Sequence, residues 1–185
     1  MSRFVWFLSG VFAVAVVLAL VAFVTLRGAH GFSTADRPSA LEAWIARTAR
    51  SMAMPADAKN RANPVPDSPE ALAEARAHWA DRCAICHANN GSGDIEMGKH
   101  MYPHAPDMRK AGTQNMTDGE IFWTIQNGVR MTGMPAWGAS GHDEEDSWKL
   151  VRFIRHLPHL SPQEEKDLLN GATPHATTPT TPPRH

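Results

Sequence analysis

Two cysteines and a histidine within five residues carry the strongest chemical signal in this sequence. Cys83-Ala84-Ile85-Cys86-His87 has the form Cys-x-x-Cys-His, and the chain has no other cysteine. Two thiols spaced in this way at the end of a helix can form thioethers to the two vinyl groups of haem, and the adjacent histidine can then ligate the iron. The motif therefore predicts one covalently attached haem c, held by Cys83, Cys86 and His87.

Two other interpretations of the cysteine pair are possible. A thioredoxin-like redox pair needs a βαβ setting, and half of a zinc site needs two further ligands; the sequence offers neither. A helix pattern before the motif, glycines at 91, 93 and 98 after it and a downstream Met-Pro pair favour haem. Two cysteines only three positions apart cannot cross-link a whole fold, so we expect the haem to stabilise the domain. Without haem, we expect the domain to have little stable structure.

A methionine is the expected second axial ligand of the iron. In Thr132-Gly133-Met134-Pro135 the proline disfavours helical geometry at Met134, which suits an extended loop across the ring face. A thioether ligand favours ferrous iron and raises the reduction potential. Met134 is the predicted ligand; the alternatives are Met131, Met101, His100 and His104.

Local start and stop signals place these residues on an all-α framework. Ser68-Pro69-Glu70 opens a helix that runs into Cys83. Further helices are expected from the capping box Thr117–Glu120 to Asn127-Gly128, from within Asp143–Ser147 to about Leu157, and from Ser161 to Asn170-Gly171. No run of alternating apolar and polar residues indicates a strand.

The N-terminus reads as a membrane anchor. From Phe4 to Leu26 there are 23 consecutive uncharged residues, or roughly 35 Å of helix at 1.5 Å per residue. A cleaved signal peptide, the alternative, usually has a shorter apolar region ending in a small-x-small site. Arg3 and Arg27 flank the span almost symmetrically and do not set its orientation. Covalent haem attachment in bacteria takes place outside the cytoplasm, so the haem domain is expected in the periplasm, with the helix in the inner membrane.

Residues 28–68 are expected to join the anchor to the haem domain. Pro38–Met52 is predicted to be an amphipathic helix whose apolar stripe is formed by Leu41, Trp44, Ile45 and Met52. This helix either lies among lipid headgroups or packs on the domain or on a partner. Pro55–Pro69 contains four prolines and is predicted to be a semi-extended tether. The domains are then an anchor (1–27), this linker (28–68), a haem domain (69–170) and a disordered tail (171–185).

Charge is distributed unevenly along the chain. Residues 27–66 carry six Lys/Arg against three Asp/Glu, whereas residues 69–170 carry ten against fifteen. The linker is therefore basic, as an approach to anionic lipid favours, and the haem domain is acidic. Nothing here indicates a nucleic-acid partner. The acidic run Asp143–Asp146 is most simply a solvated helix start, and docking of a basic partner is the alternative.

Residues 69–158 resemble a class I c-type cytochrome, a small all-α fold around one haem. In that family a small residue and an aromatic on the first helix cross an apolar residue and an aromatic on the last. The matching positions here are Ala75 and Trp79, and Leu150 and Phe153. The resemblance also implies that the carbonyl of Pro106, with Pro103 as an alternative, accepts the Nδ1 hydrogen of the ligating histidine.

Electron transfer is the expected function, because a six-coordinate haem iron has no open position for a substrate. No nucleotide motif or catalytic triad accompanies the haem motif, so the chain is expected to be an electron carrier rather than an enzyme. Its partners would be redox proteins and the lipid bilayer, with no small-molecule substrate. The alternatives are a haem subunit of a multi-protein dehydrogenase or terminal oxidase, and a haem-based ligand sensor.

Overall fold

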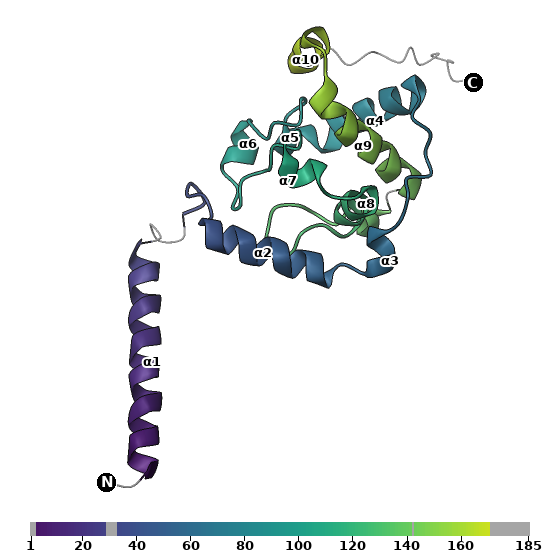
Figure 1. The fold of residues 1–185 in the computed structure, drawn as a ribbon. Coiled ribbons are helices and arrows are strands. Elements are labelled where there is room, and N and C mark those ends of the chain that lie inside the picture. Colours follow the sequence, from purple (N-terminus) through teal and green to yellow (C-terminus); the bar gives the residue numbers. More distant parts are fainter. Residues whose placement is uncertain (1–2, 29–32, 142, 171–185) are drawn as a thin grey trace, which may run out of the picture. The chain divides into compact units, whose positions relative to one another are not determined.

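The computed structural model describes residues 3–28, 33–141 and 143–170, and within these ranges the regular structure is entirely helical. The all-α prediction is therefore confirmed. The chain divides into two compact units, residues 1–37 and residues 38–185 (Figure 1). The predicted tail, 171–185, lies outside the described residues.

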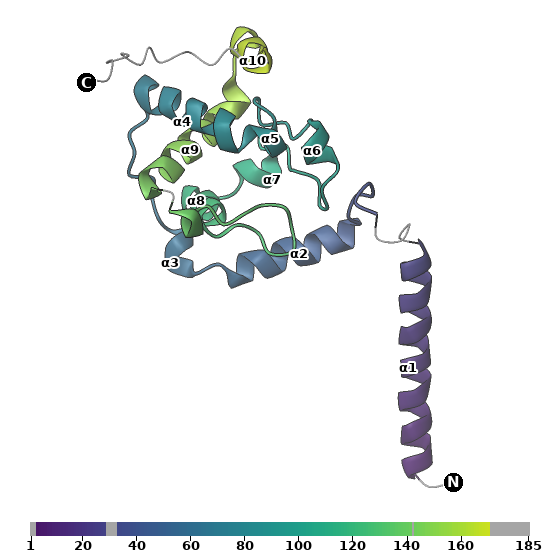
Figure 2. The ribbon, with the colours of Figure 1, turned by 180° about the vertical axis from the view of Figure 1, so that it is seen from behind.

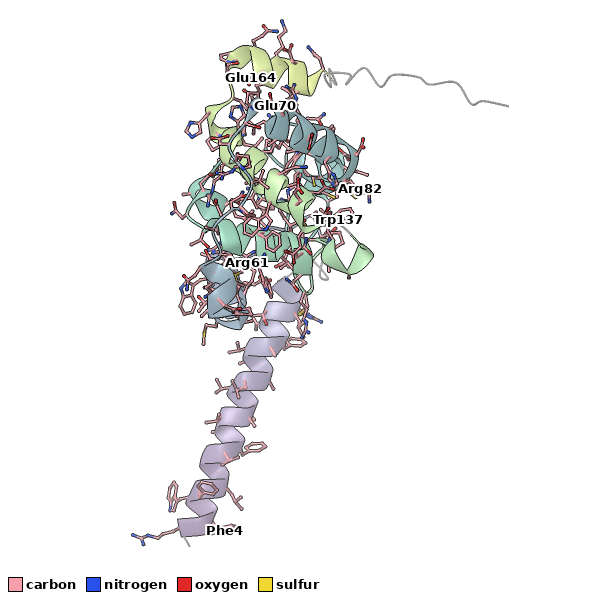
Figure 3. All side chains as sticks on the ribbon, turned by 90° about the vertical axis from the view of Figure 1, so that its right-hand side faces the viewer. Phe4, Arg61, Glu70, Arg82, Trp137 and Glu164 are labelled. Atoms are coloured by element: carbon pink, nitrogen blue, oxygen red, sulfur yellow. The ribbon has the colours of Figure 1, made fainter. Side chains whose placement is uncertain are left out.

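In the described part of the first unit the one helix is α1, Arg3–Gly28. All of its side chains are exposed, as the apolar residues beyond Phe4 illustrate in Figure 3. The hydroxyls of Ser9 and Thr25 donate to the carbonyls of Val5 and Val21, one turn earlier, at 2.9 Å, so the helix satisfies its own polar groups. By length and composition α1 can cross a membrane, a property that an N-terminal signal sequence shares.

The core of the second unit forms where α4, Pro69–Arg82, packs against α9, Glu144–His156 (Figures 1 and 2). The Ser68 hydroxyl caps α4 by accepting the Ala71 N–H at 3.2 Å, as predicted. The two pairs taken from the cytochrome resemblance are all buried, and the ring centroids of Trp79 and Phe153 lie 5.4 Å apart. The expected helix crossing is therefore confirmed.

The remaining helices surround this crossing. Capping boxes open both α8, Asp118–Asn127, and α10, Pro162–Leu169, as the sequence predicts. The Phe122 ring of α8 stacks on Trp148 of α9, with centroids 4.0 Å apart. Shorter helical turns lie between and after these helices: α5, Ala84–His87; α6, Glu96–Lys99; α7, Ala111–Gln114; η1, Gly138–Ser140; and η2, Leu157–His159.

The segment predicted to be a tether is instead part of the folded unit. It contains a short helix, α3, Ala56–Lys59, and Val65 is buried in the core. The Arg152 guanidinium donates to the Val65 carbonyl at 2.7 and 2.9 Å, and the Asn63 amide donates to the Trp148 carbonyl at 3.0 Å. We call residues 55–66 the strap. Its prolines do prevent a long helix, but the one apolar residue between two of them reaches the core.

Arg61 binds the strap to both α8 and α9 (Figure 3). Its guanidinium lies over the ring of Phe122, 4.5 Å from the centroid, and 5.2 Å from that of Trp148. It also pairs with Glu144 at 3.0 Å. The strap passes so close to α8 that a Cβ at Gly119 would collide with the Ala58 carbonyl. The folded part of the second unit therefore begins well before the boundary at residue 69 that the sequence suggested.

Val65→Ala should lower the free energy of unfolding by about 2 kcal/mol, because it removes two buried methyl groups at about 0.8 kcal/mol each and leaves a cavity. Denaturant unfolding of the holoprotein measures the change. Leu169→Ala is the control, since that side chain is 59% exposed. A Val65 variant no less stable than this control would restore the tether interpretation.

Helix α2, Ala40–Ala53, forms where the amphipathic pattern predicts it and belongs to the second unit. Ser39 caps it, with the hydroxyl accepting the Glu42 N–H at 3.2 Å. Its apolar stripe does not pack on the described part of the second unit, because Leu41, Trp44, Ile45 and Met52 are all exposed. The other side of the helix does contact that unit, through Arg50 and Met116, so packing on its own domain is observed for the helix but not for the stripe.

Candidate haem site

The Cys-x-x-Cys-His motif forms one tight turn at the end of α4. Cys83 ends α4 and begins α5; its N–H donates to the Trp79 carbonyl at 2.9 Å, and its own carbonyl accepts the His87 N–H at 2.9 Å. Both thiols are free and half-buried. His87 is buried beside Trp79, with ring centroids 5.8 Å apart. The α4–α9 crossing thus positions the motif directly, because Trp79 contacts both Phe153 and His87.

The electrostatics of the two thiols argue against a redox-active or metal-binding pair. Burial raises the pKa of Cys83 to about 12, with the neighbouring Cys86 adding to the shift and Arg82 opposing it. Burial also raises the pKa of Cys86. Reactive Cys-x-x-Cys pairs have lowered thiol pKa values instead. Among the described residues no group of three or more His, Cys, Asp or Glu side chains could hold a metal ion.

The imidazole of His87 is held in the form that can ligate iron. Burial lowers the pKa of His87 to about 4, while the backbone carbonyl of Pro106 raises it by a smaller amount. The ring is therefore neutral at neutral pH, as a metal ligand must be. The buried Nδ1 atom has no hydrogen-bond partner in the structure.

A glycine-containing loop ties the motif to the segment that carries Pro106. The Gly93 N–H donates to the His87 carbonyl at 2.9 Å, and the Ala105 N–H donates to the Gly98 carbonyl at 2.9 Å. A Cβ at Gly98 would lie 2.6 Å from the Gly93 carbonyl oxygen. No larger residue fits there, so the glycines predicted to favour haem attachment allow the chain to fold back closely on the motif.

Met134 lies on a second loop, residues 129–136, that follows α8 and is here called the ligand loop. The Val129 N–H donates to the Met134 carbonyl at 3.2 Å, and the Met134 N–H donates to the Thr132 hydroxyl at 3.1 Å. Gly128 has φ +65°, and a Cβ there would come within 2.7 Å of the Met134 carbonyl oxygen. These contacts fix the backbone on both sides of the half-buried Met134 side chain.

The alternative ligands have different environments. Met131 is 92% exposed and has φ +60°, so its side chain is in solvent. His100 is exposed, and its Nδ1 lies 2.9 Å from the Glu96 carbonyl oxygen. His104 is half-buried, and its buried Nε2 has no hydrogen-bond partner. The Met101 sulfur occupies the space where a Cβ at Gly133 would lie; Met101 therefore supports the ligand loop.

Some supporting contacts could not be expected from the sequence. Arg82, at the end of α4, lies over the ring of Trp137, 5.8 Å from its centroid, and Figure 3 shows the two labelled side chains close together. This contact joins the helix that carries the motif to the segment just after the ligand loop. Met101 against Gly133 is a second such contact. Neither has a local signal, since each joins residues far apart in the chain.

The acidic run at the start of α9 is largely compensated within the domain. The Asp143 carboxylate caps the helix by accepting the Glu145 N–H at 3.1 Å, and Glu144 pairs with Arg61. The Lys149 ammonium lies 2.9 Å from Glu145 and 2.7 Å from Glu74. These pairs support the helix-start interpretation of the run and leave less free charge for a partner.

The donor set fits a covalent haem. Two protonated thiols, a neutral buried imidazole and a half-buried thioether are the groups that haem c attachment and His/Met ligation require. When bound, haem supplies one-electron chemistry at iron.

An all-α domain in which α4 crosses α9 beside a Cys-x-x-Cys-His turn has the arrangement expected of a class I c-type cytochrome. Residues 70–154, slightly less than half of the chain, match the family model described as cytochrome C oxidase, cbb3-type, subunit III. This part of the chain is therefore a class I c-type cytochrome domain, which transfers electrons and carries covalently bound haem c with its iron. It fits an electron carrier or an oxidase subunit. No curated protein matches the sequence.

Proposed function

We propose that this chain is a membrane-anchored monohaem cytochrome c that transfers single electrons between redox partners on the periplasmic side of a bacterial inner membrane. The observation that carries the proposal is the tight Cys83–His87 turn, which places both thiols beside a buried imidazole that packs on Trp79. Such a set is suited to thioether formation and iron ligation rather than to thiol redox chemistry.

Each candidate residue has a separate role in this proposal. Cys83 and Cys86 form the thioethers, and His87 and Met134 ligate the iron. The Pro106 carbonyl accepts the Nδ1 hydrogen of His87, which orients the ring and strengthens it as a donor to iron. Held by both His87 and Met134, the haem would supply one-electron chemistry and would leave no position for a substrate, so the inferred partners are redox proteins rather than small molecules.

The location follows from α1 together with the cofactor. A helix of 26 residues is longer than the roughly 20 that a bilayer requires. The second unit, residues 38–185, carries the cytochrome domain and is here called the cytochrome unit. Since covalent haem attachment takes place outside the cytoplasm, the cytochrome unit then faces the periplasm.

Cell fractionation tests this topology. The holoprotein should sediment with the inner membrane, resist extraction by high salt and carbonate, dissolve in detergent, and keep its first residues. Protease added to spheroplasts should digest the cytochrome unit while a cytoplasmic marker enzyme survives. A mature N-terminus near residue 30, recovered in the soluble periplasmic fraction, would refute the anchor.

A stable complex is the second candidate function, and the family match to an oxidase subunit favours it. In that case the cytochrome would be a permanent haem subunit rather than a free carrier. Purification in mild detergent, followed by mass spectrometry of associated proteins, separates the two. A ligand-sensing haem is a third candidate; it requires a weak iron–methionine bond, which carbon monoxide binding to the unmodified protein would reveal.

A further inference from the structure

Helix α2 presents an apolar face that no described part of its own unit covers. Leu41, Trp44, Ile45 and Met52 are 66, 60, 53 and 81% exposed. At 100° per residue these four positions fall within a single stripe along the helix. The other large apolar side chains exposed on the described part of the second unit form no stripe of this length: they are Ile85, Ile95 and Met97 at the start of α6, Met131 and Leu169.

The opposite face of α2 attaches the helix to the cytochrome unit. The Arg50 guanidinium lies 4.0 Å from the Met116 sulfur, and Met54, just after the helix, is buried. Near the start of the helix the Tyr102 hydroxyl donates to the Glu42 carboxylate. These contacts hold the helix by one side, while the four side chains of the apolar stripe on the other side are exposed; Figure 2 shows α2 along the edge of its unit.

Connectivity and charge indicate what covers the stripe. Only residues 29–39 separate the end of α1 from the start of α2, and at up to 3.6 Å per residue they reach roughly 40 Å at most. Residues 27–66 carry six basic against three acidic side chains, and Arg37 and Arg47 are exposed. A basic amphipathic helix of this kind, with a tryptophan on its apolar face, is suited to the interface of an anionic bilayer.

We propose that α2 lies in the headgroup region of the same membrane that α1 crosses, with Leu41, Trp44, Ile45 and Met52 inserted among the lipids. The inference rests on the membrane span in the proposed function. Anionic phospholipid, rather than a second copy of the chain, is the occupant, because pairing two such helices would bring two basic segments together. The helix thereby fixes which side of the cytochrome unit faces the bilayer.

Spin labels on the full-length holoprotein test this placement. Thioethers occupy both native cysteines in the holoprotein, so an introduced cysteine is its one free thiol. Ile45→Cys places a nitroxide on the stripe, and Ala46→Cys, also exposed but about 100° around the helix, is the matched control. Both proteins are reconstituted into vesicles of phosphatidylethanolamine and phosphatidylglycerol. Power saturation of the electron paramagnetic resonance signal then measures how often each nitroxide collides with oxygen, which enters lipid, and with a nickel chelate, which stays in water.

The label at 45 should collide with nickel at least fivefold less than the label at 46, while its collision with oxygen stays high. Adding Leu41→Glu should reduce that difference, because a carboxylate on the stripe resists insertion. Equal nickel collision at 45 and 46 would overturn the proposal. Protection of position 45 from both reagents would also overturn it, because a protein surface, in this sample a second copy, would then cover the stripe.

A third label, Val14→Cys in α1, distinguishes failure of this inference from failure of the anchor. If α1 spans the bilayer, that label collides with oxygen and hardly at all with nickel. Nickel access at both 14 and 45 would show that the anchor itself is wrong. Nickel access at 45 alone would reject only the interfacial role of α2.

Discussion

Met134→Ala should abolish the weak far-red sulfur-to-iron absorption band, lower the reduction potential and allow carbon monoxide to bind the ferrous haem. The three effects share one cause, because loss of the thioether removes a ligand that favours ferrous iron and leaves a coordination position open. Axial ligation sets haem potentials over a range of about 0.8 V, so the shift should exceed that of any surface substitution. Visible spectra, a redox titration and carbon monoxide difference spectra measure the three properties.

Met131→Ala is the matched control, since it removes the same type of side chain three residues earlier. Its side chain is 92% exposed, so we expect the band, the potential and the resistance to carbon monoxide to persist. Loss of the band in the Met131 variant alone would show that the ligand assignment is wrong. If neither variant lost it, Met101, His100 and His104 would become the candidates.

Replacing both thiols, Cys83→Ser with Cys86→Ser, should leave no haem that resists acid–acetone extraction and should abolish cooperative thermal unfolding. The domain is small for its stability to depend on apolar side chains alone, and the buried His87 Nδ1 is left without a good hydrogen bond. Covalent haem adds apolar contact area and ties the end of α4 to the rest of the core. Extraction followed by a haem stain, and circular dichroism during heating, measure the two effects.

Ile85→Ala controls for disturbance of the motif turn, because this side chain lies between the two cysteines and is 61% exposed. We expect it to keep covalent haem and a cooperative transition. A double-serine variant that still melted cooperatively after removal of all haem would contradict the stabilising role assigned to the cofactor.

The starts of the helices could be predicted from the sequence, because the residues that determine them are neighbours in the chain. Ser68, Thr117 and Ser161 each cap a helix by accepting the backbone N–H three residues further along the chain. These helix starts therefore do not depend on distant contacts. The packing of α4 on α9 came instead from the cytochrome resemblance. It is confirmed because Trp79 and Phe153 must both be buried by the same helix crossing.

The strap could not be predicted from the sequence, because contacts between residues far apart in the chain determine its structure. Val65 stands alone among prolines, and its burial depends on the carbonyl contact from Arg152, 87 residues later. Composition therefore indicated a tether where the fold forms the strap. The same limit applies to the candidate site: the spacing of Cys83, Cys86 and His87 is a local pattern, whereas the support that Met101 gives the ligand loop depends on tertiary packing.

The contrast between the two methionines of the ligand loop has a consequence for oxidative damage. A peroxide approaching from solvent meets the Met131 sulfur first, because that side chain is 92% exposed and Met134 is only partly accessible. Conversion of Met131 to its sulfoxide adds polarity to a side chain already in water, so it disturbs no packing. The same change at Met134 would replace a soft sulfur donor with a polar group. The exposed methionine can thus consume oxidant on the same loop while the thioether that we propose as the iron ligand remains intact.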